Sequence, residues 1–280
     1  MSAINATLVR LFDLLLAPLS GLAPTWGVVL FSVLFGVVVL WVYKKTSNQE
    51  KLEQVKRRIH AGLFEIRLFN DSMPAIFRAQ AEILRANLHY LALSLVPLAW
   101  MIVPLTLVVA QLQFHWGYRG LEPGKAVLLE ATLAPSAASS PKDASGAPQV
   151  TLSAPPGVKV EAGPVFSPKE RQLTWRISAE RAGTYELALE VGGQRITKSL
   201  VSSQRVVRRS PIRVGGSFLD QLLYPAEPPL PSGSPVVEIT LGYPEAEVSL
   251  FGWKTHWLIA SILLSIVVAF ALRKPMGVTI

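Results

Sequence analysis

The chain has 280 residues, of which 50% are hydrophobic and only 16% are charged, whereas soluble domains carry about 25% charged residues. It contains no cysteine, which excludes disulfides, thiol catalysis and cysteine-ligated metals. The net charge is +8, but no nucleic-acid-binding motif accompanies it, so we expect no DNA partner.

Residues 1–25 predict an amphipathic helix that lies in the membrane interface on the external side. Leucine and isoleucine recur at helical spacing, while Asn5, Arg10 and Asp13 fall on other faces. The apolar positions are Ile4, Leu8, Leu11, Leu15 and Leu19. Proline and glycine residues between positions 18 and 24 end this helix before the next one begins.

Three uncharged apolar stretches, residues 26–43, 91–113 and 255–272, predict transmembrane helices. About 20 apolar residues in a helix cross the hydrocarbon core of a bilayer. A helix also satisfies its own backbone polar groups, as hydrocarbon requires. The lipid bilayer is therefore the first expected partner.

The connection between the first two stretches, residues 44–90, is short and rich in Lys and Arg. The tail, residues 273–280, begins with Arg273 and Lys274. Short basic segments stay on the cytoplasmic side of a membrane. We therefore expect a multi-pass protein of the bacterial inner membrane, with its N-terminus outside and its C-terminus inside.

Residues 44–90 predict a cytoplasmic helical hairpin, because apolar residues recur every three or four positions on both sides of a break at residues 70–74. The densest basic run in this hairpin is Lys56, Arg57 and Arg58. Such a run is most often a solvated face or a topology determinant. Contact with anionic lipid or with ribosomal RNA is the alternative.

Residues 114–254 predict an extracytoplasmic all-β domain, an immunoglobulin-like sandwich that is clearest in residues 149–202, with Trp175 in its core. The predicted strands are residues 126–133, 149–152, 158–161, 173–178, 184–191, 196–201, 236–241 and 246–251. Residues 135–148 predict a loop, and residues 224–235 predict an extended strap with Leu230 among its apolar anchors.

The densest basic group of this external domain is Arg205, Arg208, Arg209 and Arg213. A solvated strand or loop face is the default interpretation of such a group. Binding of an acidic partner or of phospholipid headgroups is the alternative.

The sequence contains no catalytic motif and no cluster of metal-ligating residues, so we expect neither an enzyme nor a cofactor. Uncharged polar side chains do occur within the predicted spans. They are Ser32, Ser94, Thr106, Gln111, Ser261 and Ser265. Such residues support helix packing or, where they converge, line a shallow intramembrane groove.

The order of elements resembles the three-helix core of the YidC/Oxa/Alb insertase superfamily, which includes archaeal YidC-like proteins and insertase-type subunits of the ER membrane. The resemblance covers residues 4–113 and 253–280. An external amphipathic helix leads through Pro24-Thr25-Trp26-Gly27 into the first span, and a basic segment after Tyr43 opens a charged hairpin.

The resemblance implies a protein that assists the insertion or folding of membrane-protein clients through a shallow polar groove, without catalytic chemistry. It also implies that the hairpin receives the client and can contact the ribosome or translocon. The first span lacks the intramembrane arginine of bacterial YidC, which motivates a second hypothesis. In that hypothesis the chain is a structural subunit, or scaffold, whose sandwich and hairpin bind partner proteins.

Overall fold

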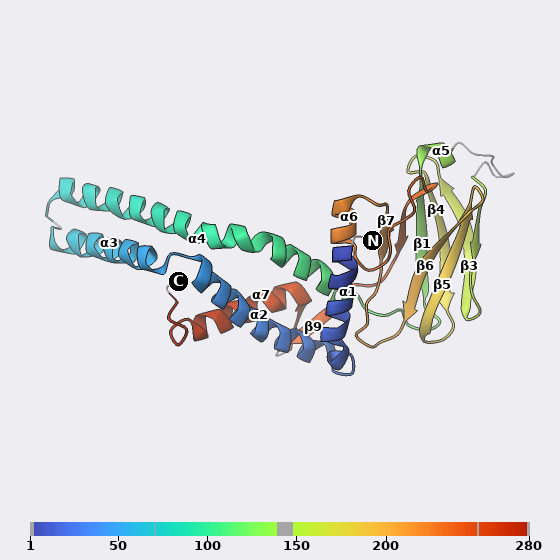
Figure 1. Ribbon diagram of the computed structural model, residues 1–280, viewed down its shortest axis with the longest axis horizontal. Helices are drawn as coiled ribbons and strands as arrows, with labels where there is room; N and C mark the ends of the chain where they lie inside the picture. The colour runs from blue at the N-terminus through green and yellow to red at the C-terminus, as the bar shows by residue number, and fades with distance from the viewer. Residues whose placement is uncertain (1–2, 70, 139–147, 251, 279–280) are drawn as a thin grey trace. The chain divides into compact units, whose positions relative to one another are not determined.

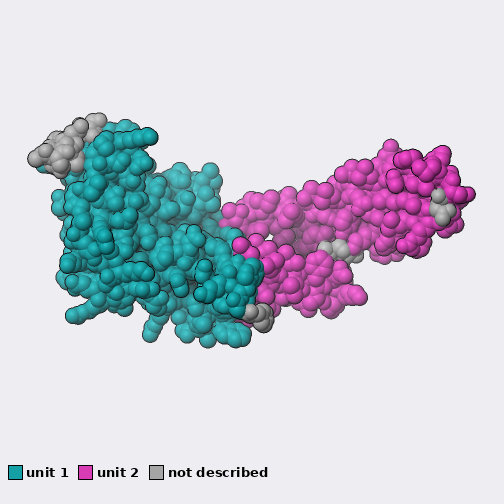
Figure 2. Space-filling model, turned by 180° about the vertical axis from the view of Figure 1, so that it is seen from behind, with its two compact units in different colours: residues 1–27, 107–258 teal, residues 28–106, 259–280 magenta. Residues whose placement is uncertain are grey.

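The computed structural model describes residues 3–69, 71–138, 148–250 and 252–278. The chain forms two compact units (Figure 2), unit 1 from residues 1–27 and 107–258 and unit 2 from residues 28–106 and 259–280. It passes between the units within three helices, α2 (Pro24–Thr46), α4 (Met73–Trp116) and α7 (Trp257–Leu272). Most of the predicted loop at residues 135–148 lies outside the described residues, and its first part forms the short helix α5 (Pro135–Ala138).

Two of the described helices, α2 and α4, are long and apolar enough to cross a membrane. The third apolar helix, α7, has 16 residues, which span about 24 Å at 1.5 Å per residue. The apolar pattern predicted that this helix starts at residue 255, but Thr255 and His256 belong to strand β10 (Trp253–His256). Their backbone pairs with strand β9 (Glu247–Leu250), so the helix begins two residues later.

Unit 2 contains an antiparallel helix pair formed by α3 (Gln49–Leu68) and the first part of α4 (Figure 1). The Asn48 side chain caps α3 by accepting a hydrogen bond from the backbone N–H of Lys51 at 3.0 Å. Gly62 allows close approach, since a Cβ atom there would lie 2.7 Å from Ile83 Cγ1. The α4 helix then continues through Pro97 and Pro104 for a total of 44 residues.

Unit 1 begins with α1 (Ala3–Leu16) and a short 3₁₀ turn, η1 (Ala17–Leu19). The Asn5 side chain donates to the backbone oxygen of Gln221 at 2.8 Å, and Leu16 is buried. Leu14 and Leu15 remain 74% and 60% exposed. One face of α1 therefore contacts the protein, and apolar side chains on another face are uncovered.

The β region of unit 1 consists of two antiparallel sheets and a two-stranded ribbon formed by β9 and β10. The strands of the sheets are β1 (Ala126–Leu133), β2 (Val150–Ser153), β3 (Val158–Ser167), β4 (Gln172–Ala179), β5 (Gly183–Val191), β6 (Gln194–Ser202), β7 (Ile212–Val214) and β8 (Val236–Leu241). The larger sheet has the order β3-β4-β1-β8-β7, and the smaller has the order β2-β5-β6.

Both sheets contribute to one hydrophobic core. Leu129, Trp175 and Ile177 of the larger sheet and Leu187 and Leu200 of the smaller one are each at most 2% exposed. The burial of Trp175 confirms the prediction. The core nevertheless extends beyond residues 149–202, because β1 lies in the middle of the larger sheet and pairs with both β4 and β8.

Residues 224–235 follow a short helix, α6 (Phe218–Leu223), that the sequence did not predict. Leu230 is 2% exposed and belongs to the core, and its backbone N–H donates to the Val214 oxygen at 2.9 Å. The prediction of Leu230 as an apolar anchor is confirmed. Leu223, the last residue of α6, is 44% exposed.

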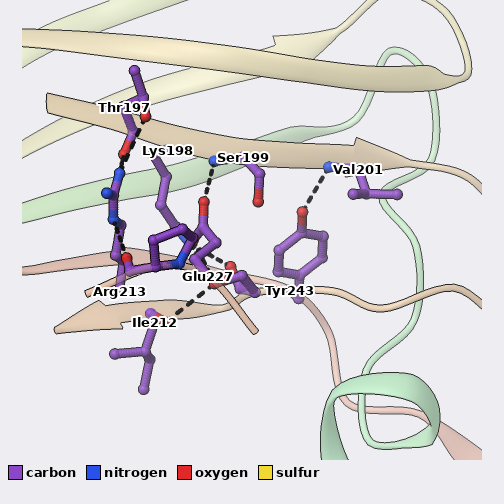
Figure 3. A network of polar contacts seen from close by, with 10 residues as sticks. Thr197, Lys198, Ser199, Val201, Ile212, Arg213, Glu227 and Tyr243 are labelled. Carbon is purple, nitrogen blue, oxygen red and sulfur yellow. Dashed lines mark hydrogen bonds and ion pairs between the residues drawn. The ribbon is translucent and has the colours of Figure 1, made fainter. Parts of the chain in front are cut away.

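Side chains close the corner between the two sheets where the edge strand β6 meets β7 (Figure 3). The backbone N–H groups of Ser199 and Val201 donate to Glu227 Oε1 at 2.6 Å and to Tyr243 Oη at 2.7 Å. Arg213 donates to the backbone oxygen of Thr197. These three alternate residues of β6 point their backbone groups away from β5, so side chains complete hydrogen bonds that no neighbouring strand supplies.

The centre of this corner is a buried ion pair between Lys198 and Glu227. Lys198 is fully buried, and its ammonium also donates to the Ser210 backbone oxygen at 2.5 Å and to Ser210 Oγ at 2.9 Å. Burial lowers the pKa of Lys198 to about 8, an effect that Glu227 partly offsets. Burial alone would raise the pKa of Glu227, but Lys198 and the hydrogen bonds from Ser210 and Ser199 bring it below its usual value.

Replacing Glu227 by Gln should destabilise the protein by about 3 kcal/mol, because the buried Lys198 ammonium then lacks a counter-charge. The measurement is denaturant unfolding of the full chain in detergent micelles, followed by tryptophan fluorescence. Adding Lys198→Met to Glu227→Gln should recover part of the loss. A double variant less stable than Glu227→Gln alone would contradict this account.

The stability should also depend on pH through Lys198. Its folded pKa of about 8 lies below the ordinary value of 10.5, so between these values the unfolded chain binds a proton that the folded chain does not. The free energy of unfolding should therefore rise with pH across this window, and this gain should be lost as the pH falls through about 8. The stability difference between wild type and Lys198→Met, measured at several pH values, checks the expectation, and a difference independent of pH would refute it.

Candidate functional site

Two of the predicted groove residues meet where α2 packs against α7. The Ser265 hydroxyl donates to the backbone oxygen of Ser32 at 3.0 Å, and the Ser32 hydroxyl donates to the Val28 oxygen at 2.6 Å. Gly36 adjoins the same contact, since a Cβ atom there would lie 3.0 Å from the Ser265 oxygen and 3.2 Å from Val268 Cβ. The Ser265 hydroxyl thus links α7 to α2 in a close packing contact, while the Ser32 hydroxyl is satisfied within its own helix.

The other polar residues of the predicted spans do not join this contact through any hydrogen bond within the described residues. Thr106 is exposed and donates to the Ile102 oxygen of its own helix at 2.8 Å. Gln111 lies in unit 1, where its side chain accepts a hydrogen bond from Arg208. Ser94 is half-buried and Ser261 is buried. Of the six predicted residues, the structure therefore brings Ser32 and Ser265 into hydrogen-bond contact.

The three basic residues of the hairpin have different surroundings. Lys56 Nζ lies 5.6 Å from the centre of the Tyr90 ring, and its pKa is lowered by burial and by Arg273. Arg57 pairs with Glu53 at 2.7 Å on the same helix, but both side chains are more than half exposed, so the pair stabilises little. Arg58 faces a cavity between α3 and α4.

This cavity has a volume of about 490 Å³ and is lined by residues of both hairpin helices. Its charged and titratable residues are Arg58, Glu65, Glu82, Arg85 and His89. Sequence reasoning identified only Arg58 here. The helical spacing of the others was the available signal. Glu65 follows Arg58 by seven residues on one face of α3, and Glu82, Arg85 and His89 follow one another by three and four residues on one face of α4.

The end of the hairpin carries a group of exposed apolar side chains, termed the hairpin tip. They are Leu63, Phe64, Leu68, Phe69, Met73 and Phe77, with exposures between 48% and 72%. The residue pattern predicts helices in this segment but does not by itself reveal its apolar surface. Clustered exposed apolar side chains of this kind mark surfaces that bind protein or membrane.

Three of the four arginines of the predicted basic patch are engaged inside the protein, so the interpretation of the group as a solvated face is wrong for them. Arg209 is 3% exposed and donates to backbone oxygens that include those of Tyr118 and Ser203. Arg213 bonds to the backbone of Thr197 and Pro228. Arg205 is exposed, as predicted.

Arg208 connects α1 to the end of α4. Its guanidinium donates to Asp13 Oδ1 at 2.9 Å and 3.0 Å and to Gln111 Oε1 at 3.0 Å. The buried His115 ring contacts the same Asp13 oxygen at 3.1 Å and the Gln111 backbone oxygen at 3.0 Å. This charged cluster attaches the amphipathic helix to the rest of unit 1.

The described residues contain no group of three or more His, Cys, Asp or Glu side chains placed to hold a metal ion. Comparisons with known proteins add no family: no family model, no curated protein and no solved structure matches the chain.

Replacing Gly36 by Leu should separate α2 from α7 and destabilise the protein by about 1–3 kcal/mol, the usual cost of overpacking. The measurement is thermal unfolding of the full chain in lipid nanodiscs by circular dichroism. Val33→Leu enlarges an exposed side chain of the same helix and should be neutral. Equal stability of both variants would show that the Ser32–Ser265 contact does not hold these helices together.

Proposed function

We propose that this chain is an insertase-like membrane protein of the YidC/Oxa/Alb superfamily. It assists the insertion or folding of membrane-protein clients in the bacterial inner membrane and carries out no catalytic chemistry. In this proposal α2, α4 and α7 cross the bilayer, the hairpin lies in the cytoplasm, and the β region is an extracytoplasmic immunoglobulin-like sandwich. The short α7 reaches both surfaces because Arg273 and Lys274 extend from its end toward the headgroups.

The single observation that carries the proposal is the hairpin tip. Exposed apolar surface costs about 25 cal/mol per Å² in water, so Phe64, Leu68, Phe69 and Phe77 favour an apolar occupant. A client helix that has left the ribosome and not yet entered the bilayer offers such a surface. The flexible, polarisable side chain of Met73 suits a site that accepts many sequences.

The cavity between α3 and α4 supports the same proposal because it offers polar contacts beside the apolar tip. Its mixed charges from Arg58, Glu65, Glu82 and Arg85 can receive the hydrophilic residues that flank a client helix. The tip and the cavity lie on the same two helices, so one hairpin offers both kinds of contact. In this proposal the largely uncovered apolar surface of α4, with its exposed residue Thr106, extends the client contact from the hairpin into the membrane.

The packing of Ser32 against Ser265 favours the second candidate function, a scaffold subunit. An insertase groove needs polar side chains that are available to the client, whereas these two are used between α2 and α7. If the chain is a scaffold subunit, the hairpin tip binds one constant partner rather than successive clients.

Photocrosslinking distinguishes client contact from lipid contact. A photoreactive amino acid at Phe77 or Thr106 should capture nascent membrane proteins during their synthesis, while the same group at Leu40, which is 2% exposed, should not. The products are identified by mass spectrometry. Capture of lipid alone from both exposed positions would refute the insertase proposal.

Purification in mild detergent separates the two candidate functions. Clients should co-purify in small and variable amounts that depend on continuing translation. A scaffold should instead retain one partner in constant stoichiometry after translation is stopped. Replacing Phe77 and Leu68 by Ser should reduce client capture strongly, and Leu34→Ser, an equally apolar and exposed change on α2, provides the control.

A further inference from the structure

Arg209 is a buried cation without a counter-ion. It is 3% exposed, and its two terminal nitrogens donate to the backbone oxygens of Tyr118, Ser203 and Arg205 at 2.6–2.9 Å. Within the described residues it forms no ion pair, and its Nε–H finds no acceptor. Burial lowers the pKa of Arg209, but an arginine stays protonated in proteins, and buried charges are normally paired.

Arg209 lines a cavity of about 180 Å³ in unit 1. Two further arginines, Arg119 and Arg205, line the same cavity and are exposed, and their side chains form no ion pair within the described residues. The opposing charge is a single carboxylate, Glu247, which is exposed. His115 also lines the cavity but is engaged by Asp13 and the Gln111 backbone. The arginines thus leave an excess of positive charge.

The size of the cavity selects a small anion. A water molecule occupies about 30 Å³ in the liquid, so the space corresponds to about six waters. That volume accommodates one phosphate group with a few waters but no larger part of a headgroup. Guanidinium groups match phosphate oxygens in geometry and charge, so a cavity lined by three arginines suits this anion.

The position of the cavity indicates where such a phosphate comes from. Its lining includes Pro24, the first residue of α2, and Trp116, the last residue of α4. These are the ends of the two helices long enough to cross a membrane, and aromatic residues at such ends favour the headgroup level. Trp26 and Trp253, in the same unit, are 66% and 53% exposed.

We propose that this cavity, formed by Arg119, Arg205 and Arg209, binds the phosphate group of an anionic phospholipid headgroup. The lipid phosphate supplies the counter-charge that Arg209 lacks, and it anchors the β region to the outer leaflet. This site is independent of client insertion and would serve a scaffold equally well.

The test uses the full chain, purified in detergent and free of added lipid. It is titrated separately with phosphatidylglycerol, with diacylglycerol and with inorganic phosphate, and binding is followed by native mass spectrometry and by the thermal unfolding temperature. Phosphatidylglycerol should bind at one saturable site and raise the unfolding temperature. Diacylglycerol, which has the same chains without phosphate, should do neither.

The double variant Arg119→Gln, Arg205→Gln should bind phosphatidylglycerol at least about tenfold more weakly, since each arginine contributes charge-assisted hydrogen bonds. Both side chains are exposed, so the fold should be unaffected. The double variant Arg181→Gln, Arg195→Gln removes the same charge from exposed positions elsewhere in the β region and should bind like wild type. Arg209→Lys keeps the charge but loses Nε–H, and should also weaken binding.

Each remaining outcome contradicts part of the proposal. An effect of inorganic phosphate that depends on Arg119 and Arg205, without an effect of the lipid, would identify a free anion as the ligand and refute the lipid anchor. Equal binding by both double variants would show that only general surface charge attracts the lipid. Absence of binding by both phosphate compounds would refute the site itself.

Discussion

Polar groups that leave water need partners, and this constraint governs both units of the protein. In the apolar helices the constraint is mild, because backbone groups are satisfied within each helix and Ser32 and Ser265 need only a nearby carbonyl oxygen. In the β region it is severe. Lys198 and Arg209 are charged and buried. Lys198 donates to the backbone oxygen and hydroxyl of Ser210, and Arg209 donates to several backbone oxygens. The first has a carboxylate partner in Glu227, and the second has none within the described residues.

The same constraint accounts for the division of surface types along the chain. The apolar sides of α1 and α4 are uncovered by protein, and apolar surface of this extent marks contact with lipid or with another apolar surface. Beside these apolar surfaces the chain carries groups of charged side chains. Arg208, Asp13 and His115 form one such transition near the last turns of α4, and the hairpin cavity forms another beside the apolar tip.

Regular elements of this protein could be predicted from sequence because their patterns are local. Strands β1 and β8 have the bounds that alternation predicts, and Trp175 is buried as expected. The three residues of β7 were missed because this strand depends on pairing with β8, which lies more than 20 residues further along the chain. The ribbon strand β10 was missed although its partner β9 is close in the chain, because the residues of β10 directly adjoin the apolar pattern of α7. The start of α7 was misplaced because Thr255 and His256 pair with β9 instead of joining the helix.

The candidate sites were harder to predict, because residue type does not reveal burial. Arg208 and Arg209 are adjacent in a basic run and look alike in sequence. One pairs with Asp13, 195 residues away, and the other is enclosed by loop carbonyls. Glu227 lies in the proline-rich segment that was predicted as an extended strap, and nothing local indicated that it pairs with Lys198. The resemblance to insertases rests on element order, which the comparisons neither support nor oppose.

The closed edge of β6 has a consequence for how the β region meets other molecules. An open edge strand offers unpaired backbone groups on which another chain can add a strand, the usual route to domain swapping and aggregation. In β6 those groups are already taken by Glu227, Tyr243 and Arg213. On the other side of the β region, the register of β3 is interrupted around Ala162 and Val165, which makes that edge a poor template. Addition of a foreign strand at β6 or at β3 is therefore disfavoured, a protection that the chain achieves with no disulfide.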